Sequence, residues 1–354
     1  MKKIILVLIL SVFSLSALAQ IFTEEENARI DLALEYSDSG REDEAIAIYD
    51  ELIKKHPDIS SLKFEKAYCF YQKEDYKTAY KVLKSTFSAP DVRPEHFAVA
   101  GNCQDMMGQP EKALKTYQEG LKRFPESGYL HLETGNVLIA HGYTREGIEY
   151  YEKGIEVDPT FASNYYRAAL CLIEDQPVKG IIYAEMHNLL YDPNGPRWAE
   201  MSKALYDAYN ANIHFEADSI RTTFSRDRNI YIDANADNSP AALLKAMEPI
   251  SQEIHFTEAM TLAIDPEALQ ATGGKLTLAE LSAIRRRFLE NYDKKEQEKY
   301  PVFSFQKHIL DGGHWEAYNM WMLREGRPEE FSAWLEDNSA ALEAFFRFIG
   351  GGEE

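Results

Sequence analysis

The sequence contains one local cluster of titratable side chains that could carry out acid–base or metal-dependent chemistry. His308, Asp311, His314 and Glu316 lie within one short stretch near the C-terminal end. His314 and Glu316 form an H-x-E pattern, which zinc-dependent deaminases combine with a P-C-x-x-C motif. The chain has no P-C-x-x-C motif, and its Trp-rich surroundings favour a packing or capping role for His314. Because perturbed titratable groups gather at active sites, the region around His308 and His314 supports an alternative hypothesis, an enzyme or a small-ligand binder.

Two serine–lysine pairs have the spacing of a nucleophilic site. Ser60 with Lys63, and Ser304 with Lys307, match the S-x-x-K pattern of certain serine acyl-transfer enzymes. The companion S-D-N and K-T-G motifs are absent, as are G-x-S-x-G, H-E-x-x-H and a phosphate-binding Gly-rich loop with Lys. We therefore predict that the chain is not an enzyme and uses no cofactor.

One polar segment imitates the start of a calcium-binding loop. Asp233, Asn235 and Asp237 have the spacing of the first ligands of such a loop. Leu244 stands where the loop requires a bidentate Glu, and Asn238 stands where it requires Gly. The segment is therefore predicted to be a polar turn that caps the following helix, and no metal site is predicted.

Three consecutive arginines, Arg285, Arg286 and Arg287, resemble a basic patch. Consecutive residues of an α-helix point about 100° apart, so these side chains cannot share one flat face. We expect them to pair with acidic side chains of the surface.

Small residues and prolines recur with a period of 34 residues. Pro125, Pro159 and Pro193 follow this interval, and Pro57 lies 68 residues before Pro125. The same interval separates the members of two series of small residues, which are Ala45, Ala79, Ala113 and Gly147, and Ala33, Ala67, Gly101, Gly135 and Ala169. A period of this length corresponds to two short antiparallel helices with their turns. Small side chains at fixed positions indicate close helix crossings, and Gly108 is expected in the turn between two helices.

Segments such as "GREDEAIAIYDELIKKHP" and "GYTREGIEYYEKGIEVDP" resemble the tetratricopeptide repeat family. The resemblance covers residues 22–195 and implies a right-handed α-solenoid of about five helix-turn-helix units. The first positions of these units are Glu26, Ser60, Pro94, Gly128 and Ala162. After Pro196 the period disappears, and residues 197–354 are predicted to form a separate, mainly helical region. Apolar residues alternate with polar ones within 219–233, a pattern that is consistent with a short β-hairpin there.

All three cysteines fall at the tenth position of their units. Cys69, Cys103 and Cys171 therefore lie at equivalent points of stacked repeats, roughly 10 Å apart by helix packing. A disulfide needs Cα atoms within about 7 Å. We predict three free, buried thiols.

The resemblance also implies a concave surface lined by the first helix of each unit. The residues predicted to contact a partner there are Phe64, Tyr68, Tyr71, Asn102, Asp105, Tyr129, Asn136 and Tyr166. Such positions can also be partly core, but several aromatic residues on one open face are typical of peptide-binding grooves. Co-chaperone members of the family bind acidic peptide tails through Lys, Arg and Asn. Asn102 and Asn136 match that pattern, but no Lys or Arg does, which disfavours such an acidic-tail clamp.

The N-terminal residues have the three-part layout of a secretory signal peptide. Lys2 and Lys3 precede an apolar run, and small residues follow up to Ala19, so residues 1–19 are predicted to be removed. A membrane anchor is the alternative, but the apolar run is shorter than the ~20 residues that span a bilayer. We therefore expect a periplasmic or secreted protein without membrane insertion after cleavage.

The net charge of the chain limits the classes of molecule that can be its partner. The chain has 38 Lys and Arg against 58 Asp and Glu, a net charge of −20. So acidic a chain repels phosphate backbones and anionic lipids, which disfavours nucleic acid as a partner. The leading hypothesis is an all-α, non-enzymatic interaction module that binds an extended peptide or an envelope protein in the groove of its repeats. A structural subunit of an envelope assembly is a third possibility.

Overall fold

A computed structural model describes residues 22–216, 219–225 and 240–350 of the chain. The predicted signal peptide and the polar turn at Asp233–Asp237 lie outside these residues. The chain divides into two compact units, residues 1–158 and 159–354. Neither unit contains, within its described residues, a helix that is both long and apolar enough to cross a membrane.

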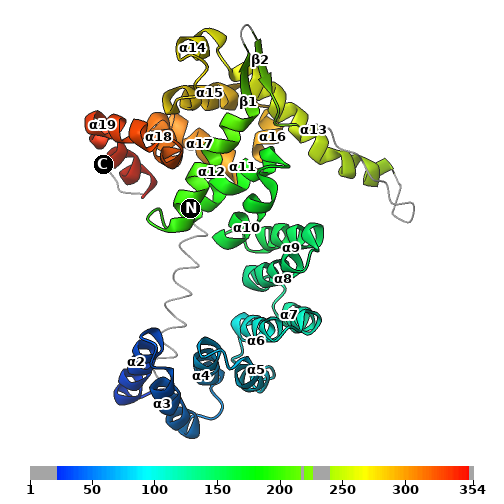
Figure 1. Ribbon diagram of the computed structural model, residues 1–354, viewed down its shortest axis with the longest axis vertical. Helices are drawn as coiled ribbons and strands as arrows, with labels where there is room; N and C mark the ends of the chain where they lie inside the picture. The colour runs from blue at the N-terminus through cyan, green and yellow to red at the C-terminus, as the bar shows by residue number, and fades with distance from the viewer. Residues whose placement is uncertain (1–21, 217–218, 226–239, 351–354) are drawn as a thin grey trace. The chain divides into compact units, whose positions relative to one another are not determined.

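The first unit consists of helix pairs that follow one another along the chain (Figure 1). They are α2 (Glu24–Asp38), α3 (Glu42–Lys55), α4 (Ser60–Gln72), α5 (Tyr76–Lys84), α6 (Pro94–Met106), α7 (Pro110–Arg123), α8 (Gly128–Ala140) and α9 (Thr144–Val157). Helices α4, α6 and α8 begin at the predicted first positions of their units. The all-α, repeat-built fold predicted from the 34-residue period is confirmed.

Left-handed backbone at one position of each repeat turns the chain between its two helices. Gly40, Gly108 and Gly142 have φ values of 75°, 72° and 86°. In the second repeat the equivalent residue is Glu74, with φ of 61°. Glycine adopts this conformation at little steric cost, whereas other residues are strained in it. The predicted turn at Gly108 is therefore confirmed, and Glu74 is an exception within the series.

The predicted close crossings bring a glycine of one helix against a tyrosine of the next. A Cβ atom added to Gly101 would lie 2.0 Å from Cε1 of Tyr117, and one added to Gly135 would lie 2.4 Å from Cε1 of Tyr151. Both tyrosine side chains are almost completely buried. These glycines are therefore required by packing.

The second unit starts with the fifth repeat and continues into the C-terminal region (Figure 1). Its elements are α10 (Ala162–Leu172), α11 (Pro177–Leu190), α12 (Pro196–Asn212), β1 (Ile213–Glu216), β2 (Ser219–Thr222), α13 (Pro240–Ala263), α14 (Pro266–Ala271), α15 (Leu278–Asn291), α16 (Lys294–Glu298), α17 (Pro301–Asp311), α18 (Trp315–Met322), the 3₁₀ helix η1 (Arg324–Gly326) and α19 (Pro328–Ile349). The predicted end of the repeats near residue 195 stays a prediction.

Segments that are distant in the sequence cover α12. The ring centroids of Trp198 and Trp321 lie 4.8 Å apart, and the guanidinium of Arg324 lies 3.9 Å from the Trp198 ring centroid. Gly326 of η1 packs so closely that an added Cβ would lie 2.2 Å from Cβ of Tyr206. Helix α18 and η1 thus bury the apolar side of α12, as a cap would.

The hairpin of the C-terminal region begins earlier in the chain than predicted. Strand β2 lies within the predicted segment and pairs antiparallel with β1, which precedes that segment. Helix α13 is a single helix, and α15 starts with a capping box formed by Thr277 and Glu280.

The predicted thiols are free. Cys69 and Cys103 are buried, while Cys171 is half-buried. Cys69 faces the core of the first two repeats, and its Sγ lies 3.6 Å from Oγ of Ser37.

Candidate functional site

Helix α4 carries three aromatic side chains on one face, which we call the aromatic stripe: Phe64, Tyr68 and Tyr71. The ring centroids are 6.3 Å apart for Phe64 and Tyr68 and 6.1 Å apart for Tyr68 and Tyr71, with the rings nearly parallel in both pairs. Tyr68 is 39% exposed, and its two neighbours are half-buried. The stripe therefore presents apolar surface to solvent on the first helix of the second repeat.

The opposite face of α4 fixes the direction in which the stripe points. Leu62 and Cys69 are buried on that opposite face, whereas Ala67 is buried one turn before Tyr71, in the core cluster against which Phe64 and Tyr71 pack. At the N-terminus of α4, the backbone N–H of Ser60 donates to Oδ2 of Asp91 at 2.8 Å. Core packing and this hydrogen bond hold α4, so the stripe is a fixed surface.

Three polar residues predicted to contact a partner form hydrogen bonds or ion pairs within the first unit. Asn102 satisfies its hydrogen bonds when its Nδ2 faces the hydroxyl of Tyr117 at 2.5 Å. The hydroxyl of Tyr151 donates to Oδ1 of Asn136 at 2.9 Å. Asp105 lies 3.1 Å from Nε2 of His141. The two amides thus position core tyrosines, a structural task that the sequence analysis did not anticipate.

The same two amides hold a carboxylate that the sequence analysis missed. Oε2 of Glu133 on α8 accepts from Nδ2 of Asn136 at 3.4 Å and lies 3.3 Å from Nδ2 of Asn102 on α6. Helices α6 and α8 pack side by side, so both amides reach this carboxylate. Glu133 is therefore fixed between the first helices of the third and fourth repeats.

Tyr129 connects these helices electrostatically to the aromatic stripe. Burial raises the pKa of Tyr129, and the carboxylates of Glu133 and Glu95 raise it further. Tyr68 and Tyr71 act on the same phenol in the same direction. Helix α6 packs against both α4 and α8, and we call the surface formed by these three first helices the first-helix face.

Glu95 is a second carboxylate that the sequence analysis missed. It occupies the second position of its unit, equivalent to Tyr129 in the next unit, so the 34-residue spacing could have identified it. Its Oε2 atom is enclosed and accepts no hydrogen bond from the described residues. Nε of Arg93 lies 3.7 Å away from this atom.

Tyr166 belongs to the second unit, where side chains of α11 and α12 surround it. Its hydroxyl donates to Oε2 of Glu200 at 2.6 Å. Arg197 lies over its ring at 5.0 Å, and the ring of His187 lies 5.2 Å away. Its predicted contact with a partner stays a prediction.

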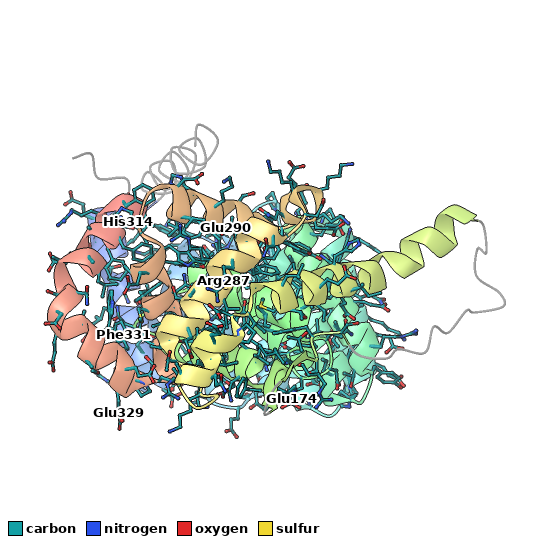
Figure 2. All side chains as sticks on the ribbon, turned by 90° about the horizontal axis from the view of Figure 1, so that it is seen from above. Glu174, Arg287, Glu290, His314, Glu329 and Phe331 are labelled. Atoms are coloured by element: carbon teal, nitrogen blue, oxygen red, sulfur yellow. The ribbon has the colours of Figure 1, made fainter. Side chains whose placement is uncertain are left out.

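The four residues of the titratable cluster contact side chains outside the cluster. The rings of His308 and His314 both pack on Phe348, at centroid distances of 4.7 and 4.6 Å. Asp311 pairs with Lys307 at 3.5 Å, and Glu316 accepts from Nε1 of Trp334 at 2.8 Å. His314 lies at the turn before α18 (Figure 2). The two imidazoles thus cover an aromatic residue of α19, and within the described residues no group of His, Cys, Asp or Glu could hold a metal ion.

Ser304 and Lys307 lie at a hollow of about 390 Å³ in the second unit. Lys294, Gln297 and Glu290 also line it, and Glu290 is visible on α15 beyond Arg287 (Figure 2). Both Ser304 and Lys307 are exposed, and Lys307 makes the ion pair with Asp311. Among the residues that the structure describes, neither contacts a group that would activate it as a nucleophile or base.

All three arginines were expected to pair with acidic side chains of the surface, but only one of them does. Arg286 does so, with Oε1 of Glu290 at 3.3 Å, whereas Nε of Arg287 donates to the carbonyl of Ala263. Arg285 is 2% exposed and donates to Oε1 of Glu185 on α11 at 2.5 Å. Consecutive residues of a helix point about 100° apart, so Arg286 points to solvent while Arg285 points into the core.

A buried hydrogen-bond network surrounds Glu185. Its Oε1 also accepts from Nε2 of Gln306 at 2.7 Å and from the hydroxyl of Tyr318. Burial lowers the pKa of Arg285, but Glu185 and neighbouring phenols more than offset this, so that the pKa is raised. The network joins α11 to α15, α17 and α18, and its complete burial leaves no room for a substrate.

Comparison with known proteins agrees with this architecture. A family model described as tetratricopeptide repeat matches residues 30–90, and a second with the same description matches residues 100–127. The chain carries tetratricopeptide repeats. The small glutamine-rich tetratricopeptide repeat-containing protein 2 of Mycosarcoma maydis is 26% identical over 87 residues. This match spans only a quarter of either protein.

Solved tetratricopeptide repeat structures are similar to part of the chain. A thermophilic repeat protein of Thermus thermophilus is 14% identical, with a TM-score of 0.43, and the match covers 51% of this chain and 98% of that one. MamA is 19% identical, with a TM-score of 0.36 and coverage of 44% and 91%. YrrB, described as having an unusual peptide-binding site, is 19% identical, with a TM-score of 0.34 and coverage of 52% and 94%. These similarities concern the fold of the repeats.

Proposed function

We propose that the tetratricopeptide repeats of the first unit bind an extended peptide, or an extended segment of an envelope protein, on the first-helix face. The observation that carries this proposal is the exposed aromatic stripe of α4. Tyr68 stacks between two other rings while 39% of it stays exposed to solvent. A partner that covers the stripe removes apolar area from water and gains a hydroxyl partner from each tyrosine.

The stripe is suited to binding because it is already rigid before a partner binds. Tyrosine loses little conformational freedom on contact, and the helix that carries the stripe is held by its own core. The amides of Asn102 and Asn136 are engaged with core tyrosines and with Glu133. Contact with a partner therefore falls to the aromatic side chains and to the carboxylates beside them.

The proposal includes export to the periplasm or to the outside of the cell. Its support is the order of Lys2 and Lys3, the apolar run and the small residues that end at Ala19. Sequencing the N-terminus of protein purified from the native envelope tests this part. A mature chain that begins at Gln20 supports export, and a chain that retains residues 1–19 contradicts it.

Binding is tested by selecting peptides from a displayed random library on the purified mature chain. Selected peptides are then titrated against three proteins: the unmodified chain, the Tyr68→Ala variant and the Tyr143→Ala variant. Tyr143 is the matched control because it is 57% exposed and lies in the turn before α9. Loss of an interface hot spot costs about 2 kcal/mol or more, which corresponds to roughly a 30-fold weaker Kd.

We expect the roughly 30-fold weaker Kd for Tyr68→Ala but not for Tyr143→Ala, and an unchanged melting temperature for both variants. A buried aromatic residue behaves differently, since its truncation costs about 3 to 5 kcal/mol of folding stability. Selected peptides that bind all three proteins equally would show that the contact surface lies outside the aromatic stripe.

A further inference from the structure

The first-helix face combines aromatic rings with carboxylates, and this combination carries information about the partner. Tyr68 and Tyr71 come from α4, Glu95 from α6, and Tyr129 and Glu133 from α8. Helix α6 packs against both α4 and α8. The ring of His96, next to Glu95, lies 4.9 Å from that of Phe64, and Oε2 of Glu133 lies 3.3 Å from Nδ2 of Asn102, so these residues belong to one surface. Aromatic faces and carboxylates both attract cations, the faces through their quadrupole and the carboxylates through their charge.

The two carboxylates differ in how they are held. Glu133 accepts from the amides of Asn102 and Asn136, which fixes its position. Glu95 has one enclosed oxygen that accepts no hydrogen bond from the described residues, and its ion pair with Arg93 is long, at 3.7 Å. The Glu95 side chain as a whole is 40% exposed, so a donor from a partner can reach its other oxygen.

The two carboxylates, Glu95 and Glu133, make the electrostatic field on this face negative. Glu133 raises the pKa of Tyr71 and of Tyr117 as well as that of Tyr129, in each case after burial as the larger cause. A carboxylate at the C-terminus of a partner or a Glu side chain would meet repulsion here. The net charge of −20 favours the approach of basic segments over a longer range.

We propose that the partner segment is cationic and places an Arg or Lys side chain between the aromatic stripe and the carboxylates of Glu95 and Glu133. This proposal rests on the proposed function, because it concerns the same face, and it adds the chemistry of the occupant. The cation stacks on the tyrosine rings while its N–H groups donate to the two carboxylates. Arg suits both contacts best because its guanidinium is planar and presents several donors.

The test uses three fluorescent decapeptides in one Ser-Pro-Ala background that differ only in their central residues, which are Arg, Gln or Glu. Each is titrated against the full mature chain at low and at high salt. We expect the Arg peptide to bind about tenfold more tightly than the Gln peptide, and the Glu peptide to bind most weakly. The preference for Arg shrinks at high salt because exposed charges are screened.

The location of the cation is tested with the double variant Glu95→Gln/Glu133→Gln. Its control is Glu111→Gln/Glu119→Gln, which removes the same charge from exposed positions of α7. The preference for Arg is expected to disappear in the first variant and to remain in the second. Thermal melting and the single variant Glu95→Gln, whose side chain is 40% exposed, separate a loss of binding from a loss of fold.

Several results would overturn the proposal. A Gln peptide that binds as tightly as the Arg peptide, with both weakened by Tyr68→Ala, would exclude the cation site while supporting the proposed function. A preference for Arg that survives Glu95→Gln/Glu133→Gln would place the cation elsewhere on the chain. Stronger binding of the Glu peptide, or no measurable binding of the Arg peptide at low salt, would contradict a cationic occupant.

Discussion

One core position of the second helix is filled differently in the two units. At intervals of 34 residues this second-helix core position holds Tyr49, Leu83, Tyr117, Tyr151 and Glu185. The first four side chains are buried and mostly apolar. Tyr49, Leu83 and Tyr117 belong to hydrophobic clusters that each join two neighbouring repeats. The fifth is a carboxylate, 1% exposed, that accepts hydrogen bonds from three C-terminal helices. The same second-helix core position thus completes an apolar core in the first unit and organises a polar network in the second.

The comparison shows how a periodic array can be joined to an aperiodic region. Apolar positions of a repeat accept any neighbour of similar shape, because the hydrophobic effect is not directional. A buried carboxylate accepts only partners that satisfy it, so Glu185 specifies the contacts of Arg285, Gln306 and Tyr318. The first unit is therefore a scaffold that presents a surface, whereas the second uses its distinctive side chains internally.

The largest expected effect comes from removing the charge of Glu185. Glu185→Gln leaves the buried guanidinium of Arg285 without its counter-charge, and breaking such a pair costs about 3–5 kcal/mol. Trp fluorescence during chemical denaturation measures this effect selectively, since all four Trp residues belong to the second unit. The double variant Glu185→Leu/Arg285→Met removes both charges and should recover most of the loss. A single variant as stable as the unmodified chain would refute the organising role of Glu185.

The next effect concerns the close crossings of the first unit. Gly101→Ala places a Cβ where the ring of Tyr117 now lies, and overpacking of this kind costs about 1–3 kcal/mol. Circular dichroism during urea denaturation measures the change. The double variant Gly101→Ala/Tyr117→Leu reproduces the Ala67 and Leu83 pair of the second repeat and should regain part of the stability. If Gly101→Ala costs nothing, the crossing is looser than described.

Replacing the strained residue of the turn series should stabilise the first unit. Glu74→Gly matches the glycines at the equivalent positions of the other repeats, and relief of left-handed strain is worth about 1 kcal/mol. Gly108→Ala is the converse change and should destabilise by a similar amount. Denaturation midpoints of both variants measure the two changes in stability. If both variants shift the midpoint in the same direction, these turn residues do not share one role.

The smallest expected effect is a loss of stability in mild acid. Burial lowers the pKa of His96 and of His131 in the first unit, so the folded state keeps these imidazoles neutral while the unfolded state binds protons. Stability from this source is present above the unfolded pKa, near 6.5, and declines as the pH falls below it. His187 of the second unit shifts in the same direction. Melting at pH 7.5 and 5.5 measures the decline, and His131→Gln should reduce it; higher stability at pH 5.5 would contradict this account.

Sequence periodicity was enough to predict the repeats of this chain. The first positions at Ser60, Pro94 and Gly128 coincide with helix starts because each repeat solves the same packing problem with the same small residues. The aromatic stripe was likewise predictable, since Phe64, Tyr68 and Tyr71 share one face of a helix by spacing alone. Position within the repeat thus determines both the fold and the direction of these side chains.

The remaining features depend on contacts between residues that are distant in the sequence. The roles of Asn102 and Asn136 could not be predicted because their partners lie on the neighbouring helix of the repeat. The partners of Glu185 lie at least 100 positions further along the chain. The signal that was available was a carboxylate at a position otherwise held by Tyr or Leu. No comparable periodic signal exists after residue 197, which is why the strand β1 that pairs with β2 was not predicted.

The central claim is that binding occurs on the first-helix face of the first unit, while the second unit uses its aromatic and charged residues internally. The most direct measurement is photo-cross-linking with a library-selected peptide that carries a benzophenone side chain, followed by mass spectrometry of the cross-linked fragments. The account predicts cross-links to α4, α6 and α8, concentrated between Phe64 and Tyr71 and around Tyr129, and their loss in Tyr68→Ala. Cross-links concentrated in α17 or α18, around His308 and Trp315, would contradict it.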